Sequence, residues 1–575
     1  MTWAEAEEKR IANEKTIAGQ MGWKYYLPEA KQTREVGQQL QEIHQQSEYK
    51  EVRDIKVIDP CMGSGHILVY AFDVLMQLYE DAGYSQRDAA QSILQNNLYG
   101  LDIDDRAAQL AYFAVMMKAR QYDRRIFSRG IQPHIYAIQE SNNINRAHLK
   151  YLGAGMDDLE VNTARVQLEG LLDTLRDAKE YGSILKVENH NWELLRRFVA
   201  AADAGEQISM DSAGLEVTAE QLLTLIDIAE TMERKYDVVV TNPPYMGSSN
   251  MSAKLSEFVK KNYPDSKSDL FAVFIERCGQ MTAKNRYQAM ITQHAWMFLS
   301  SFEKLRAKLL LRDAVNMAHL GPRAFEEIGG EVVQTTSFVL RNSHLADYKG
   351  TYCRLIEPTT QQGKEEMFLA GENRYTAQQS NFSKIPGSPV AYWVSKKIAN
   401  LFTYPLSDTV IALREGIHTG KNEMFLREWF EVSYNLIVFN ASGFDDVDRQ
   451  GRWVPYSKGG TARKWYGNNE LVIGFDDIYR RKMSTMPGHV RPSQKLYFKE
   501  GATWSALSSG FFALRMQPAG HLFDSKGQVA IGEKYKEIMG LFNTKVYQQL
   551  ADILMPTLDY KVWRCKKKLP YCHVK

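Results

Sequence analysis

Long apolar runs and a regular cysteine pattern are both missing from this sequence of 575 residues. No stretch reaches the roughly 18 apolar residues that cross a bilayer, so we expect no membrane-spanning helix. Residues 1–8 are acidic and polar and lack the apolar region of a secretory signal. The five cysteines are scattered and odd in number, which is not a disulfide framework. These absences predict a soluble protein of the reducing cytoplasm.

Common cofactor and metal motifs are missing as well. A dinucleotide-binding fingerprint after the first strand would need a third glycine where the chain has Leu68, so NAD is disfavoured. Residues 416–421 are one residue too short for a phosphate-binding loop, and Asn422 stands where that loop needs Ser or Thr. The cysteine and histidine residues near the end of the chain are too few and unusually spaced for zinc, so we expect no metal site; they are Cys565, Cys572 and His573.

The charge of the chain is unevenly distributed, although its formal net charge is only +2. Residues 411–575 hold 25 Lys and Arg against 16 Asp and Glu, a net charge of +9, and the rest of the chain carries −7. A basic C-terminal third favours a polyanionic partner such as nucleic acid. A soluble basic domain without a special partner is the alternative reading of the same count.

Alternating strand and helix patterns predict an α/β fold with a doubly wound, mostly parallel sheet over residues 51–345. The expected strands are 55–59, 99–104, 135–138, 236–240, 287–292 and 332–341, and the expected helices include 67–79 and 107–120. Residues 142–235 are helical in pattern and are interpreted as an insertion. We expect a helical N-terminal segment at 1–50, a polar connection at 346–405 and a mixed α/β domain at 406–575.

A glycine-rich turn follows the first expected strand, with the sequence Asp59-Pro60-Cys61-Met62-Gly63-Ser64-Gly65. Glycines let a ligand approach the backbone closely, and ligands of such sheets bind beyond the carboxyl ends of the strands. Asp102 ends the second strand, where its carboxylate can accept hydrogen bonds from both hydroxyls of a ribose. A solvated acid at a strand end is the structural alternative for Asp102.

The motif Thr241-Asn242-Pro243-Pro244-Tyr245 directly follows the buried strand pattern of residues 236–240. Two consecutive prolines fix the backbone, so the Asn242 side chain and the Pro243 carbonyl project in one rigid arrangement. Both oxygens can accept hydrogen bonds from a planar NH2 group and so direct its nitrogen lone pair at a methyl sulfonium. Tyr245 can stack on the ring that carries the amine. A stiff turn without catalytic function is the alternative.

The glycine turn and the Asn-Pro-Pro-Tyr motif together resemble the adenine-N6 DNA methyltransferases in the gamma order of motifs. The resemblance implies a Rossmann-like, seven-stranded sheet that binds S-adenosylmethionine. It assigns Asp59, Pro60, Gly63, Gly65, Asp102 and Glu140 to the cofactor site. It assigns the flipped adenine to Asn242, Pro243, Pro244 and Tyr245, with Phe325 as a second aromatic that stacks on the base.

Further segments resemble the methyltransferases of bacteriophage-exclusion (BREX) defence systems, the PglX type. These segments are residues 59–68, 291–299, 416–422 and 499–505. The resemblance implies a target-recognition domain after about residue 405 and other defence-system proteins as partners. Cations interleaved with glycines and aromatics in that region are the candidate DNA contacts, namely Lys458, Arg463, Lys464, Arg480 and Arg481.

These patterns predict methyl transfer from S-adenosylmethionine to adenine N6 in double-stranded DNA. Methylation of RNA or of a protein glutamine is one alternative, and a non-catalytic DNA-binding fragment or subunit of a defence complex is another. The family carries an aromatic-x-Pro motif before the glycine turn, for which Tyr26-Leu27-Pro28 is the one candidate. Compared with the family the chain is shorter at both ends, so we expect weak cofactor binding and slow methylation by this chain alone.

Overall fold

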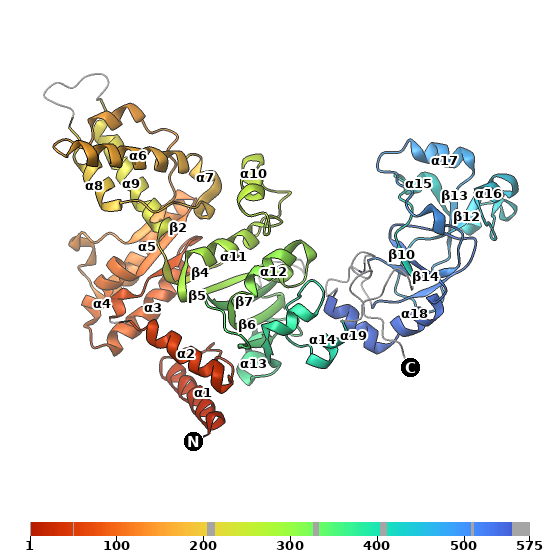
Figure 1. Ribbon diagram of the computed structural model, residues 1–575, viewed down its shortest axis with the longest axis horizontal. Helices are drawn as coiled ribbons and strands as arrows, with labels where there is room; N and C mark the ends of the chain where they lie inside the picture. The colour runs from red at the N-terminus through yellow and green to blue at the C-terminus, as the bar shows by residue number, and fades with distance from the viewer. Residues whose placement is uncertain are drawn as a thin grey trace. The chain divides into compact units, whose positions relative to one another are not determined.

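The computed structural model describes residues 2–49, 51–203, 213–325, 333–402, 411–507, 511–554 and 560. The chain divides into two compact units, Met1–Gln379 and Ser380–Lys575, called the first and the second unit below (Figure 1). None of the described helices is both long and apolar enough to span a bilayer.

A nine-stranded sheet forms the centre of the first unit. Its strands are β1 (Val57–Asp59), β2 (Leu98–Asp102), β3 (His134–Ala137), β4 (Tyr236–Thr241), β5 (Thr282–Gln293), β6 (Asp313–Pro322), β7 (Gln334–Arg341), β8 (Lys349–Arg354) and β9 (Arg374–Gln378). The order is β3-β2-β1-β4-β5-β7-β6-β8-β9. The first five are parallel to their neighbours, and β7 is antiparallel to β5 and β6. This confirms the expected α/β, Rossmann-like fold class.

The strand order reverses between β1 and β4, which lie side by side although about 180 residues separate them in the chain. Ile58 of β1 pairs with Tyr99 of β2 on one side and with Val239 of β4 on the other. A crevice forms where the connections from two such strands leave in opposite directions, and sheets of this type bind their ligands there. The fold therefore places the glycine turn and the Asn-Pro-Pro-Tyr motif at one switch point.

Helices cover the sheet because their apolar residues recur on one face. α3 (His66–Asp81) and α5 (Asp105–Tyr122) bury Leu68, Phe72 and Val115 in one core under the first three strands. The remaining helices of the central part are α4 (Gln86–Ser92), α10 (Ala253–Asn262), α11 (Leu270–Met281) and α12 (Glu303–Leu309).

Within its described residues the expected insertion consists of helices joined by loops. Its helices are α6 (Asp158–Thr174), α7 (Ala178–Tyr181), α8 (Trp192–Ala200) and α9 (Leu215–Glu233). They form a helical subdomain beside the first strands of the sheet (Figure 1). α9 runs directly into β4, so the insertion ends where the strand that carries the Asn-Pro-Pro-Tyr motif begins.

Two N-terminal helices, α1 (Trp3–Gln20) and α2 (Arg34–Gln46), belong to the first unit. The Gln32 side chain donates a 2.7 Å hydrogen bond to the Lys349 carbonyl and so fixes this segment to β8. Residues 349–378 add β8, α13 (Gln361–Ala370) and β9 to the first unit, which therefore extends into the segment expected to be a connection.

The second unit contains two four-stranded sheets. One has the order β10-β17-β14-β15 and the other β11-β13-β12-β16. Their bounds are β10 (Ala412–Arg414), β11 (Leu426–Glu428), β12 (Trp453–Ser457), β13 (Leu471–Gly474), β14 (Gly501–Ser505), β15 (Arg515–Gln517), β16 (Leu522–Phe523) and β17 (Gly527–Ile531). The helices are α14 (Lys396–Leu401), α15 (Asn422–Phe425), α16 (Phe444–Gln450), α17 (Asp477–Ser484), α18 (Tyr535–Phe542) and α19 (Lys545–Leu554). Trp504 of β14 is fully buried in the core formed with α18 and α19.

Candidate active site

The glycine turn lies at the carboxyl end of β1 and leads into α3. Gly63 and Gly65 both have positive φ, +53° and +83°. A Cβ on Gly65 would lie 2.9 Å from Ala111 Cα and Cβ of α5, so a larger residue would separate the two helices. A Cβ on Gly63 would meet nothing within 4 Å, so open space lies above the turn. The turn is closed on its protein side and open on the side where a ligand can approach.

Asp59, the last residue of β1, is completely buried below this turn. One carboxylate oxygen, Oδ1, accepts a 3.0 Å hydrogen bond from the Cys61 backbone N–H. The other, Oδ2, has no hydrogen-bond partner. Burial is the main cause that raises the pKa of Asp59 to about 7, and the negative charge of Asp102 contributes to the same rise. A buried carboxyl group with one free oxygen is suited to a cationic or hydrogen-bond-donating ligand.

Asp102 lies at the neighbouring strand end and is partly exposed. Its Oδ2 accepts a 2.9 Å hydrogen bond from Gly63 N–H, and its Oδ1 accepts one of 2.9 Å from Asp104 N–H. Carboxylate oxygens have further lone pairs, so both can still accept from ligand hydroxyls. Glu140 follows β3 and is half-buried; the same segment is attached to β2 by the 2.8 Å hydrogen bond from Ile138 N–H to the Asp102 carbonyl.

The Asn-Pro-Pro-Tyr motif begins directly after β4, on the other side of β1 from Asp102. Asn242 is exposed, and its Oδ1 accepts a 3.3 Å hydrogen bond from the Tyr245 hydroxyl. Tyr245 is half-buried, with its ring edge-on to Phe271 at 6.1 Å, and burial raises its pKa to about 12. Pro243 is buried and Pro244 is exposed. The motif therefore presents an amide oxygen and a neutral phenol beside the open side of the glycine turn.

Asp269 at the N-terminus of α11 holds the chain that leaves this motif. Its carboxylate accepts a 3.1 Å hydrogen bond from Met246 N–H, and the Met246 carbonyl accepts one of 2.9 Å from Leu270 N–H. Gly247 and Asp269 also form an isolated β-bridge. Sequence reasoning missed Asp269 because 23 residues separate it from Met246 and no local pattern announces the contact.

Ser183 of the insertion is a second residue that sequence reasoning missed. Its hydroxyl donates a 2.6 Å hydrogen bond to the Pro60 carbonyl of the glycine turn, across 123 residues of chain. The Ser183 carbonyl in turn accepts a 3.0 Å hydrogen bond from the buried Arg277 side chain of α11. The insertion thus supports the turn directly.

The predicted aromatic-x-Pro segment lies away from these strand ends. Tyr26-Leu27-Pro28 packs on the far strands of the sheet: the Leu27 carbonyl accepts from Asn316 of β6 at 3.2 Å, and the Pro28 carbonyl from Thr351 of β8 at 2.9 Å. Tyr26 lines a cavity of about 530 Å³ with residues of β6, β7 and α13. Three strands, β5, β7 and β6, separate β8 from β4, so this segment lies away from the strand ends of β1 and β4. Phe325 follows β6 and is half-buried, and its stacking on a base stays a prediction.

The predicted cations of the second unit divide into two groups. Arg463 and Arg481 are exposed, with 54% and 81% of their side chains accessible, and Lys458 is half-buried. Arg480 is committed to Asp448, with its Nη2 2.7 Å from Asp448 Oδ2, and Lys464 donates to the Asn543 carbonyl at 2.7 Å. Arg480 and Lys464 therefore stabilise the second unit. Cys565, Cys572 and His573 lie outside the described residues.

The sequence of the first unit matches two family models. Residues 96–319 match the Eco57I restriction-modification methylase family, and residues 30–151 match the DNA-methyltransferase domain of MmeI. The sequence of the first unit is therefore similar to methylase domains of restriction-modification systems. A solved structure of the Type IIL restriction-modification enzyme MmeI with DNA superposes with a TM-score of 0.48 at 11% identity, over 93% of this chain and 64% of that chain.

Two curated relatives specify the family further. The adenine-specific methyltransferase PglX of Lacticaseibacillus casei (strain Zhang) is 41% identical over 567 residues, 95% of this chain and 46% of the relative. The adenine-specific methyltransferase BrxX of Escherichia coli O9:H4 (strain HS) is 39% identical over 571 residues, 94% of this chain and 46% of the relative. These relatives confirm the resemblance to PglX-type adenine-specific methyltransferases. The chain spans about half the length of either relative.

Proposed function

We propose that the chain transfers a methyl group from S-adenosylmethionine to N6 of adenine in double-stranded DNA, as part of a bacterial anti-phage defence system. The observation that carries this proposal is the position of Asn242 and Tyr245 after β4, across the switch point from the glycine turn after β1. The similarity to PglX and BrxX supports adenine as the target and defence as the setting.

The residues at the ends of β1 and β2 fit the cofactor. The free Asp59 Oδ2 is a buried acceptor for the amino group of its methionine part, and the open space at Gly63 admits its ribose beside Asp102. Bound there, S-adenosylmethionine supplies an electrophilic methyl group. The Asp102 carboxylate stays oriented for the ribose because the Gly63 and Asp104 N–H groups hold it.

The motif after β4 suits an exocyclic amine. Adenine N6 is a weak nucleophile, and hydrogen bonds from its two hydrogens to the Asn242 Oδ1 and the Pro243 carbonyl direct the lone pair away from the ring. The amine displaces the Tyr245 hydroxyl, whose hydrogen bond to Asn242 is long at 3.3 Å. The Tyr245 ring then stacks on the flipped base. Orientation and exclusion of water supply the rate enhancement.

The test is transfer of tritiated methyl groups from S-adenosylmethionine to duplex DNA, RNA and protein by the purified chain. We expect label in DNA, recovered as N6-methyladenine after nuclease digestion. Label found only in RNA or only in protein would show that the substrate is RNA or a protein and not DNA. Cofactor and DNA binding without any label would support the non-catalytic DNA-binding alternative. Asn242→Ala is the matched control for each substrate.

A further inference from the structure

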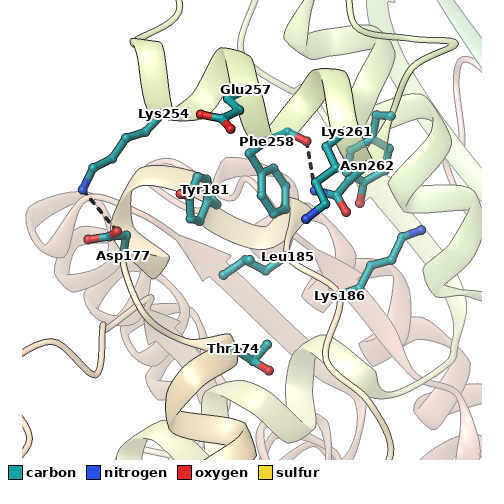
Figure 2. A pocket seen from close by; sticks show the side chains of 11 residues that line it. Thr174, Asp177, Tyr181, Leu185, Lys186, Lys254, Glu257, Phe258, Lys261 and Asn262 are labelled. Atoms are coloured by element: carbon teal, nitrogen blue, oxygen red, sulfur yellow. Dashed lines mark hydrogen bonds and ion pairs between the residues drawn. The ribbon is translucent and has the colours of Figure 1, made fainter.

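A cavity of about 690 Å³ lies between the insertion and α10 in the first unit, and the proposed chemistry does not use it (Figure 2). One wall comes from the insertion and includes Asp177, Tyr181 and Lys186. The other wall comes from α10 and includes Lys254, Phe258 and Lys261. The Tyr181 and Phe258 rings stack across the cavity at 4.4 Å, so the two walls contact each other through aromatic side chains.

Each wall is attached to a different half of the active site. On the insertion side, Ser183 lies in the chain between the lining residues Tyr181 and Leu185, and its hydroxyl donates a hydrogen bond to the Pro60 carbonyl of the glycine turn. The α10 wall belongs to a chain excursion, residues 249–267, that leaves the Asn-Pro-Pro-Tyr motif and returns to it. Both ends of this excursion are fixed by the hydrogen bonds of Asp269 and by the 3.0 Å hydrogen bond from Ser248 N–H to the Ser268 carbonyl. One wall of the cavity is therefore connected to the glycine turn and the other to the Asn-Pro-Pro-Tyr motif.

The charges around the cavity leave two cations available. Lys254 forms an ion pair with Asp177, its Nζ 3.1 Å from Oδ2, as the dashed line in Figure 2 shows. Glu257 also lines the cavity. Lys186 and Lys261 are both exposed, and within the described part of the chain neither forms an ion pair. The Lys186 ammonium lies 5.3 Å from the Tyr263 ring centroid, and the two lysines come from opposite walls (Figure 2).

We propose that Lys186 and Lys261 bind backbone phosphates of the DNA strand that carries the flipped adenine. The inference rests on the proposed function, because a nucleotide that turns out of the helix stays joined to a phosphate on each side. An enzyme must hold those phosphates close to the base site, and lysine binds phosphate as a mobile point charge. Phosphate contacts then come from the first unit as well, although all the cations that the sequence suggests for DNA lie after residue 405.

The experiment compares the full chain with the double variant Lys186→Gln/Lys261→Gln. Each lost phosphate contact lowers the slope of log affinity against log salt by about 0.9, so we expect a decrease of about 2 in total. At 0.15 M salt the affinity for duplex DNA should fall by roughly 10- to 30-fold, since two counterion-release contacts are lost. The affinity for S-adenosylmethionine should not change, because neither lysine belongs to the cofactor site.

Two further variants make the result specific. Lys9→Gln/Lys15→Gln removes two exposed charges from α1 and should leave the salt slope unchanged. Lys186→Arg/Lys261→Arg keeps both charges and should retain DNA binding. Unchanged DNA affinity in the cavity variant, or an equal loss in the α1 variant, would overturn the inference. If the unaltered chain neither binds nor methylates DNA, the proposed function fails first and the inference fails with it.

Discussion

The carboxylate of Asp102 accepts a 2.9 Å hydrogen bond from the backbone N–H of Gly63. A side chain at the end of β2 therefore holds the glycine turn that follows β1. The contact joins residues 39 positions apart in the chain, so a substitution of Asp102 is expected to disturb the glycine turn as well.

Asp102→Ala should weaken binding of S-adenosylmethionine by about 1–3 kcal/mol, the range for losing hydrogen bonds to a charged acceptor. Part of this loss comes from release of the Gly63 turn. Titration calorimetry measures it directly. The control is Asp104→Ala, which removes the neighbouring acid that caps α5 and should cost stability without changing cofactor affinity. Unchanged affinity in Asp102→Ala would remove this residue from the site.

Asn242→Ala should lower the rate of methyl transfer by on the order of 100- to 1,000-fold, the scale for losing one oriented hydrogen-bonding group in a transition state. Binding of cofactor and DNA should remain, because the side chain acts on the target amine. Single-turnover kinetics separates the two effects. Tyr245→Phe keeps the stacking ring but loses the hydroxyl that occupies Asn242, so it should retain most of the activity. Near-normal transfer by Asn242→Ala would refute the assignment.

Asp59 gives the free protein a characteristic pH dependence. Because burial raises its pKa to about 7, the folded state holds this proton more tightly than the unfolded chain does. Its contribution to the free energy of unfolding is complete below about pH 4 and is lost as pH rises through about 7. Asp59→Asn should abolish this decline, and above pH 7 it should be more stable than the unaltered chain by roughly 2–4 kcal/mol.

Urea titrations at pH 5 and pH 8 measure this difference without cofactor. Asp59→Asn should also bind S-adenosylmethionine more weakly, because an amide does not balance the positive charge of the ligand. Parallel stability curves for the two proteins across that pH range would show that Asp59 does not titrate near 7.

In the second unit, substitution of an exposed arginine should affect DNA binding, whereas substitution of the partly buried Arg480 should affect stability. Arg463→Gln and Arg481→Gln should each reduce the salt dependence of DNA binding by about one phosphate contact, with little change in melting temperature. Arg480→Gln breaks the partly buried pair with Asp448 and should destabilise the unit by roughly 1–3 kcal/mol. Filter binding over a salt series and thermal melting of each variant test the distinction. Loss of DNA binding only in Arg480→Gln would show that Arg480, and not Arg463 or Arg481, contacts DNA.

Leu27→Ala should destabilise the first unit without affecting cofactor affinity. The Leu27 side chain packs with Cys353, Leu355 and Phe368 near β8, and truncation of a buried leucine costs about 2–5 kcal/mol. Calorimetry with S-adenosylmethionine below the melting temperature tests the second part. A cofactor affinity that falls along with stability would place this segment near the methionine end of the ligand after all.

The sequence was sufficient for the features that depend on local patterns. β1, β2 and β4 are apolar and end in recognisable motifs, and parallel strands bring their carboxyl ends to one edge, so Asp59, Asp102 and Asn242 could be expected together. β9 was not expected because its residues are polar and mostly half-exposed, as befits an edge strand whose position depends on pairing with β8.

Long-range contacts account for the rest. Nothing near Ser183 indicates that its hydroxyl supports Pro60, because the partners meet only once the sheet and the insertion have formed. Arg480 looks like a phosphate ligand in the run Arg480-Arg481-Lys482, but its side chain is largely buried against Asp448. Arg481 also pairs with an acid, Asp477 of its own helix, yet 81% of its side chain stays accessible. Residue type suggests a chemistry for a side chain, but the partner that the side chain binds in the folded protein depends on the tertiary structure.

Hydrogen bonds and a β-bridge join Met246 and Gly247 to Asp269 and Leu270, and this affects which parts of the sequence can vary among related enzymes. Since the two ends of the excursion 249–267 meet at one point, its length and sequence can change while Asn242 stays in place. Residues 249–267 can then be replaced, in evolution or by design, to change how the protein binds its substrate while the Asn-Pro-Pro-Tyr motif keeps its position. Grafting a relative's excursion between Gly247 and Asp269 is the natural way to use it.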